Sequence, residues 1–123
     1  MTEPRVFLIA QPSVKRDGSF PDMRALAVHG PVTVCLESGI RVGKDPVAAL
    51  KIMESRLEHF DHTKDAIAWA GGDTLGAVLA GIALEGKIVP YFTWLRYDRR
   101  RLDDGTWTDE GAGYTPVRVH LND

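Results

Sequence analysis

The chain alternates between short, continuously apolar runs and longer stretches in which apolar residues recur every three or four positions. The short runs are typical of strands that are buried in a sheet. The last of these segments instead alternates valine or leucine with polar residues, which is typical of a strand with one exposed face. The pattern predicts five strands, at Val6–Ala10, Val32–Leu36, 65–70, 89–97 and 117–121.

The longer stretches predict three helices, at 23–28, 46–60 and 75–84. The second has the clearest start, because Asp45 can cap free backbone N–H groups and Pro46 suits the first helical position. Apolar residues then follow at helical spacing, which predicts an amphipathic helix with one face on a core. These residues are Val47, Leu50, Met53, Leu57 and Phe60.

The third helix, 75–84, has almost no polar face and is closed by Glu85 and Gly86. A helix that is apolar all round is covered on each side. Both sides are hard to cover within a chain of 123 residues. We therefore expect a protein partner at this helix, with a homodimer as the simplest form.

Strand and helix signals alternate three times before the last two strands. This order predicts an α/β fold: a single three-layer domain with a mostly parallel sheet of about five strands and an antiparallel C-terminal edge hairpin. The expected domain spans 1–123, with a polar hairpin arm at about 98–114. No window is long and apolar enough to span a membrane. We expect a cytoplasmic protein with no membrane partner.

Composition narrows the class of protein further. The apolar share of 44%, the charged share of 26% and the net charge of −2 exclude a disordered tail, a collagen-like chain and a histone-like polycation. The lone cysteine, Cys35, cannot form an internal disulfide. Its place in a predicted strand indicates a small buried apolar residue rather than a nucleophile.

The most specific motif is the turn made by Gly71, Gly72, Asp73 and Thr74, between a predicted strand and a predicted helix. Ligands bind at the carboxyl ends of strands in open α/β sheets, and helix N-termini attract anions. The turn is thus a candidate site for a nucleotide or phosphate ester. Asp73 would act as base or metal ligand, and Glu37, at an adjacent strand end, could help it to hold Mg²⁺. The alternative is structural, with Asp73 or Thr74 capping the helix.

The turn resembles the Gly-Gly-Asp-Gly-Thr or Gly-Gly-Asp-Gly-Ser signature of NAD kinases, diacylglycerol kinases and phosphofructokinases. Gly71, Gly72 and Asp73 match, but the next glycine is missing and Thr74 follows directly. The resemblance is confined to this turn. It implies a similar local geometry and adds little for activity.

Three segments resemble small uncharacterised proteins of tailed bacteriophages. They are Gln-Pro-Ser at 11–13, Trp-Ala-Gly-Gly-Asp-Thr-Leu at 69–75 and Trp-Leu-Arg-Tyr-x-Arg at 94–99. This resemblance implies a cytoplasmic role in an infected bacterium. It brings no established activity or catalytic residue.

Residues 91–101 combine four arginines with four aromatic residues. Arginine binds phosphate and aromatic rings stack on bases, which makes nucleic acid a possible partner. Nearby acidic residues offset the arginines, so protein binding and a merely structural strand remain open as alternatives. An exposed tryptophan at the arm's tip would favour binding. The candidate partner-binding residues are Trp94, Arg96, Arg99, Arg100, Arg101 and Trp107.

No recognised metal site or catalytic set accompanies these features. His59 and His62 straddle the end of a predicted helix and lack a third ligand at a known spacing. We expect no cofactor, with Mg²⁺ needed only under the enzyme hypothesis. The sequence favours a small accessory protein that is not an enzyme and that binds a host or phage protein as a homodimer. The alternatives are a nucleotide or phosphate-ester enzyme and a nucleic-acid-binding protein.

Overall fold

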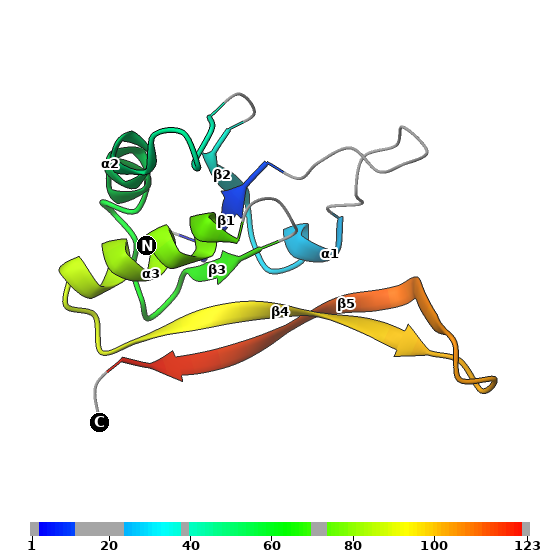
Figure 1. Cartoon of the computed structure of the whole chain (residues 1–123). Helices are drawn as coiled ribbons and strands as arrows, with labels where there is room; N and C mark the ends of the chain where they lie inside the picture. The colour runs from blue at the N-terminus through cyan, green and yellow to red at the C-terminus, as the bar shows by residue number, and fades with distance from the viewer. Residues whose placement is uncertain (1–2, 12–23, 38–39, 70–73, 122–123) are drawn as a thin grey trace.

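The computed structural model describes residues 3–11, 24–37, 40–69 and 74–121, without the side chains of 98–101 and 107–112. Five strands form one sheet: β1 (Val6–Ala10), β2 (Val32–Leu36), β3 (Ala66–Ala68), β4 (Tyr91–Arg101) and β5 (Trp107–His120). Three helices accompany them: α1 (Arg24–Ala27), α2 (Pro46–Arg56) and α3 (Leu75–Gly86). The strand order is β2-β1-β3-β4-β5, with parallel pairing except between β4 and β5. The predicted α/β fold with an antiparallel edge hairpin is confirmed (Figure 1).

The sheet separates two apolar clusters of unequal size. On one face, Phe7 and Ile9 of β1 pack in the larger cluster with α2 and α3. On the other face, Val6 and Leu8 pack in the smaller cluster with Leu26 of α1. Because β1 lies inside the sheet and is covered on both faces, all its positions need apolar side chains. This explains the continuous apolar run by which the strand was predicted.

Helix α2 begins as predicted. The Asp45 carboxylate accepts a hydrogen bond from the backbone N–H of Ala48 at 3.0 Å, and Pro46 is the first helical residue. The expected core stripe is wrong at one end, because Val47 is 64% exposed while Ala49 and Met53 are buried. Successive spacings of three rotate Val47 about 120° away from Met53 around the helix axis. The stripe therefore leaves the core at its first member.

Helix α3 lies close to the sheet because Gly76 has no side chain. A Cβ atom at this position would stand 3.0 Å from Cγ2 of Ile9 and 3.5 Å from Cδ1 of Leu36. The inner face of the helix is buried, with Leu79, Ala80 and Leu84 among the buried residues. The described residues of the chain leave the outer face open, since Val78 is 55% and Ile82 47% exposed, so the expectation that a partner covers this face stays a prediction.

Helix α3 also ends later than predicted. Gly86 is still helical, and the residue with a left-handed backbone is Ile88, at φ +56°. Glycine is the usual residue at such a helix end, because a β-branched side chain clashes with its own backbone there. The side chain of Ile88 is 83% exposed, so it gains little by burial to offset this strain.

The hairpin of β4 and β5 is longer than the rest of the sheet. Strand β3 pairs with β4 only from Thr93 to Leu95, whereas β4 and β5 pair from Tyr91 with His120 through to Arg101 with Trp107. The two strands cross in Figure 1, so that β4 is next to the body at one end and β5 runs below α1 at the other. There the backbone carbonyl of Tyr114 lies 3.0 Å from Nε2 of His29.

Asp65 holds the amino ends of the parallel strands together. It is the one buried charged side chain among the described residues, at 2% exposure. Its carboxylate accepts bonds from the backbone N–H and the guanidinium of Arg5, both at 2.9 Å, and from the backbone N–H of Asp61 at 2.9 Å. The backbone N–H of Ala66 donates in return to the carbonyl of Arg5 at 2.9 Å. These bonds set the register of β1 against β3.

We expect Asp65→Ala to lower the free energy of unfolding by about 3 kcal/mol, because it leaves two backbone N–H groups and a guanidinium without their acceptor. Urea unfolding would measure the loss. Asp104→Ala is a matched control, since this exposed carboxylate also accepts local bonds, from the backbone and hydroxyl of Thr106. Equal losses in the two variants would contradict the role assigned to Asp65.

We expect Ile88→Gly to raise the free energy of unfolding by about 0.5–1 kcal/mol, because glycine relieves the strain of the left-handed backbone. The gain is partly offset because glycine makes the unfolded chain more flexible. Ile88→Ala is the control, since it shortens the same exposed side chain and keeps a Cβ atom. Thermal unfolding of both variants would measure the difference. No gain of glycine over alanine would show that Ile88 is not strained.

Candidate functional site

The predicted acidic site is divided between described and undescribed residues. Glu37 follows β2 directly, and its side chain is 65% exposed. Oε1 of Glu37 lies 3.4 Å from Nη2 of Arg56 on α2, in an exposed ion pair. Asp73 falls outside the described residues. The two strand ends are not adjacent as expected, because β1 lies between β2 and β3. The meeting of Glu37 and Asp73 at one Mg²⁺ stays a prediction, and the described partner of Glu37 is Arg56.

The Gly-Gly-Asp-Thr turn is visible only at its last residue. Thr74 is exposed and directly precedes α3, but its side chain makes no capping hydrogen bond. Thr74 is thus at the N-cap position without a side-chain cap, and capping by Asp73 lies outside the described residues. Gly71, Gly72 and Asp73 lie outside the described residues, so a ligand site at this turn stays a prediction.

The predicted partner-binding residues fall in different places. Trp94 is half-buried and packs against the larger core cluster, on the face covered by α2 and α3. Arg96 is exposed on the same strand. The backbones of Arg99, Arg100 and Arg101 belong to β4 and that of Trp107 opens β5, but their side chains lie outside the description. The packing of Trp94 gives it a structural role.

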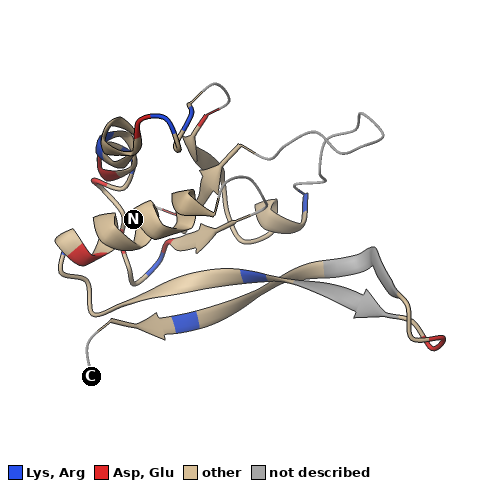
Figure 2. Ribbon diagram, in the orientation of Figure 1, with Lys and Arg blue, Asp and Glu red and all other residues tan. Residues whose placement is uncertain are grey.

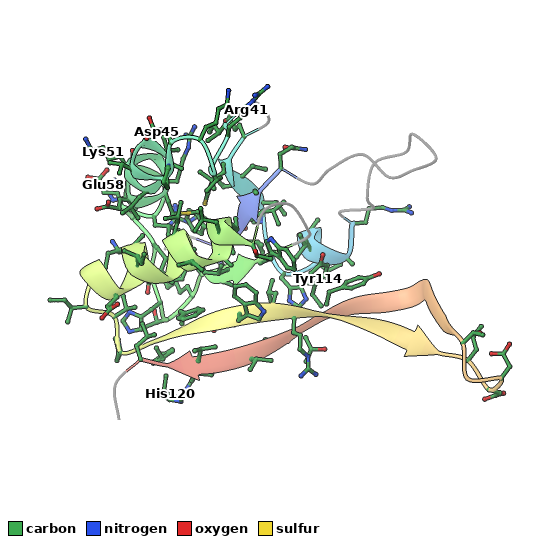
Figure 3. All side chains as sticks on the ribbon, viewed as in Figure 1. Arg41, Asp45, Lys51, Glu58, Tyr114 and His120 are labelled. Carbon is green, nitrogen blue, oxygen red and sulfur yellow. The ribbon has the colours of Figure 1, made fainter. Side chains whose placement is uncertain are left out.

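A cluster that the sequence did not single out surrounds Tyr91, at the first position of β4. The guanidinium carbon of Arg118 lies 4.3 Å from the centre of the tyrosine ring. The ring of His62 meets it edge-on at 5.0 Å between centroids, and that of His120 is tilted at 6.0 Å. We call these four residues the Tyr91 cluster. Figure 3 labels His120 at the end of β5, on the opposite side of the molecule from Arg41.

Sequence reasoning missed the cluster because three separate segments form it. The alternation at 117–121 does place Arg118 and His120 on one side of a strand. The pairing of His120 with Tyr91 depends on the hairpin register. His62 belongs to the loop before β3, which is far from both strands in the sequence. Neither could be derived from local pattern.

The ribbon around the Tyr91 cluster is basic. Residues 91–97 and 113–121 contain Arg96, Arg118 and His120 and no aspartate or glutamate. Figure 2 shows this as basic positions alone along the described part of β4 and β5. The carboxylate of Asp61, next to His62, accepts bonds from the hydroxyl and the backbone N–H of Thr63, which lower its pKa.

Cys35 is buried, with 1% of its surface exposed, and packs in the larger cluster. Burial raises the pKa of its thiol to about 12, against a smaller lowering effect of the positive charge of Arg56. A thiol that holds its proton is a poor nucleophile. The prediction that Cys35 is a small buried apolar residue is confirmed.

In the part of the chain that the structure describes, no three His, Cys, Asp or Glu side chains are grouped so as to hold a metal ion. Over the same residues, no helix has the length and apolar character needed to cross a membrane. No known protein family, curated protein or solved structure matches the chain. The function must therefore be argued from the structure itself.

We expect the Cys35 thiol to make the free energy of unfolding fall as pH rises from about 9 toward about 12. The unfolded thiol releases its proton near its ordinary pKa of 9.0, whereas the folded thiol keeps it to about 12. Its stabilising contribution is thus complete below pH 9 and is lost above it. Urea unfolding at several pH values would show a steeper decline for the natural protein than for Cys35→Ala. Equal slopes would contradict the burial effect.

Proposed function

We propose that this protein acts by binding, as a symmetric homodimer whose interface is the outer face of α3. The proposal rests on one observation, the exposed ridge of Val78, Gly81 and Ile82, which we call the α3 ridge. Val78 and Ile82 are a helical turn apart and about half exposed. Isolated exposed apolar residues are common, but here they flank a glycine on a helix whose opposite face is already buried.

Gly81 is the residue that favours a partner helix. Within the chain, Gly76 is explained by the closeness of β1, but a Cβ atom at Gly81 would meet nothing within 4 Å. A glycine in an exposed helix costs about 0.5–1 kcal/mol relative to alanine. A second helix could approach closely at this glycine, because small residues allow two helix backbones to come close together.

A second copy of the chain fits the α3 ridge better than an unrelated protein. If two α3 helices cross antiparallel near Gly81, Val78 of each copy faces Ile82 of the other, and the contact is self-complementary. Glu85 is the only charged residue of α3. This arrangement brings it to the amino end of the other helix, where a negative charge is favourable.

The setting of this role follows from the resemblance to small tailed-bacteriophage proteins, which would place the dimer in the cytoplasm of an infected bacterium. The partners of two carboxylates, the exposed Glu37 and the buried Asp65, support a binding role over catalysis. Glu37 pairs with Arg56, and Asp65 is used by Arg5 and by the backbone of Asp61.

We expect Ile82→Lys to convert the dimer into a monomer, because it places two like charges against an apolar contact. Sedimentation velocity over a concentration series would measure the shift. Val47→Lys is the matched control, since Val47 is equally a surface apolar residue, 64% exposed on α2, and should leave the dimer intact. The natural protein behaving as a strict monomer at high micromolar concentration would overturn the proposal.

Gly81→Ala separates the interface from general stability. Alanine is the better helix former, so the variant should unfold at a higher urea concentration when diluted to monomer. The methyl group of the alanine would also hold the two α3 helices apart, so the dissociation constant of the dimer should rise. A variant that is both more stable and more strongly dimeric would contradict a contact centred on Gly81.

A further inference from the structure

We propose that the Tyr91 cluster binds single-stranded nucleic acid, with a base stacked on Arg118 and phosphate oxygens held by His62 and His120. The site is on the β4–β5 ribbon and the loop before β3, whereas the proposed dimer contact is on α3. It uses other residues than the arginine run that the sequence suggested. The inference goes beyond the proposed function and stands without it.

The guanidinium of Arg118 lies over an aromatic ring. In the hairpin register Arg118 lies opposite Thr93, one diagonal step from Tyr91, which places its guanidinium over the tyrosine ring at 4.3 Å. One face of the guanidinium is thus occupied by the ring, and the residue remains exposed. An exposed guanidinium placed over a ring has its other side available to a base, because guanidinium groups stack on unpaired bases.

The charge of Arg118 is also uncommitted. Among the described residues no carboxylate forms an ion pair with it, and its guanidinium contacts the tyrosine ring. The nearby carboxylates have other partners: Asp61 accepts from Thr63, and Asp65 accepts from Arg5. A ligand that carries negative charge would therefore meet a cation that no described carboxylate neutralises.

The histidines complete the site on two sides. His62 meets the edge of the Tyr91 ring and His120 is directly opposite Tyr91 across the hairpin. Each histidine ring can donate an N–H to a phosphate oxygen. Alternating flat surfaces and phosphate donors is the pattern by which proteins hold single strands without reading their sequence.

Single-stranded nucleic acid fits this chemistry better than an acidic peptide. Both would be drawn by the positive charge, but only the nucleic acid also brings a flat π-system to stack on the guanidinium. A duplex keeps its bases stacked on one another, so it would use the charge and leave the guanidinium without a stacked base. The preference for a single strand is therefore the property that distinguishes this site.

The test is the fluorescence anisotropy of a labelled oligothymidylate of about 12 nucleotides, titrated with the full-length protein at about 50 and about 200 mM salt. We expect binding that weakens with salt. Arg118→Gln should raise the dissociation constant about tenfold and reduce its salt dependence, because it removes both the charge and the guanidinium group. Arg41→Gln, an exposed arginine on the opposite side of the molecule, should change neither.

Arg118→Lys keeps the charge and loses the flat guanidinium. We expect it to retain the salt dependence of the natural protein while still binding several-fold more weakly. The exposure of Arg118 makes both substitutions compatible with folding, and circular dichroism melting would confirm it.

Four results would overturn the inference. They are absence of binding at the lower salt concentration, equal effects of Arg118→Gln and Arg41→Gln, equal affinity for duplex DNA of the same length, and equal affinity for polyglutamate of matched charge. The last would point to an acidic protein segment as the ligand. Because Ile82→Lys alters only the proposed dimer contact, measuring it in the same assay keeps the two proposals separable.

Discussion

The buried carboxylate of Asp65 is the constraint on which the sheet depends. A charge with 2% exposure is costly unless each lone pair is used, and here the backbone of Arg5, its guanidinium and the backbone of Asp61 all donate to it. These bonds connect the residue before β1 with the residue before β3 and with the loop that follows α2. The shortest strand of the sheet, β3, is thereby held at its amino end, while its three residues are buried between β1 and β4.

This constraint orders the rest of the molecule. With β1 and β3 in register, Phe7, Ile9 and Ile67 share one face and form the floor on which α2 and α3 pack. Gly76 lets α3 approach that floor closely, which leaves the opposite side of the helix exposed. The β4–β5 hairpin pairs with β3 only over Thr93 to Leu95 and is much longer than β3. The Tyr91 cluster lies at the end of the hairpin where β4 begins and β5 ends. The α3 ridge and the Tyr91 cluster are thus both on elements that extend beyond the short strands on which they pack.

Local signals predicted the elements well where one physical cause decided them. Asp45 and Pro46 start α2 because capping and ring geometry act within one turn, and β1 is apolar throughout because both its faces are covered. Prediction failed at the ends of two helices. Val47 drifts out of the stripe by helical rotation, and the left-handed end of α3 falls on Ile88 although a glycine stands two residues earlier. Of the candidate site, Glu37 was found as an acidic strand end, but its ion pair with Arg56 needed α2 in place.

The sequence by itself determined the succession of strands and helices along the chain, the cap of α2, and which segments must be buried. These features depend on the spacing of neighbouring residues along one chain. It also determined that residues 91–97 and 113–121 carry arginine and histidine without aspartate or glutamate. Only the tertiary structure decided the strand order, the exposed side of α3 and the meeting of His62, Tyr91, Arg118 and His120. The reason is physical. The register of the hairpin decides which residues are neighbours across the strands, and the packing of a helix on the sheet decides which of its faces is exposed. Both depend on contacts between residues that are far apart in the chain.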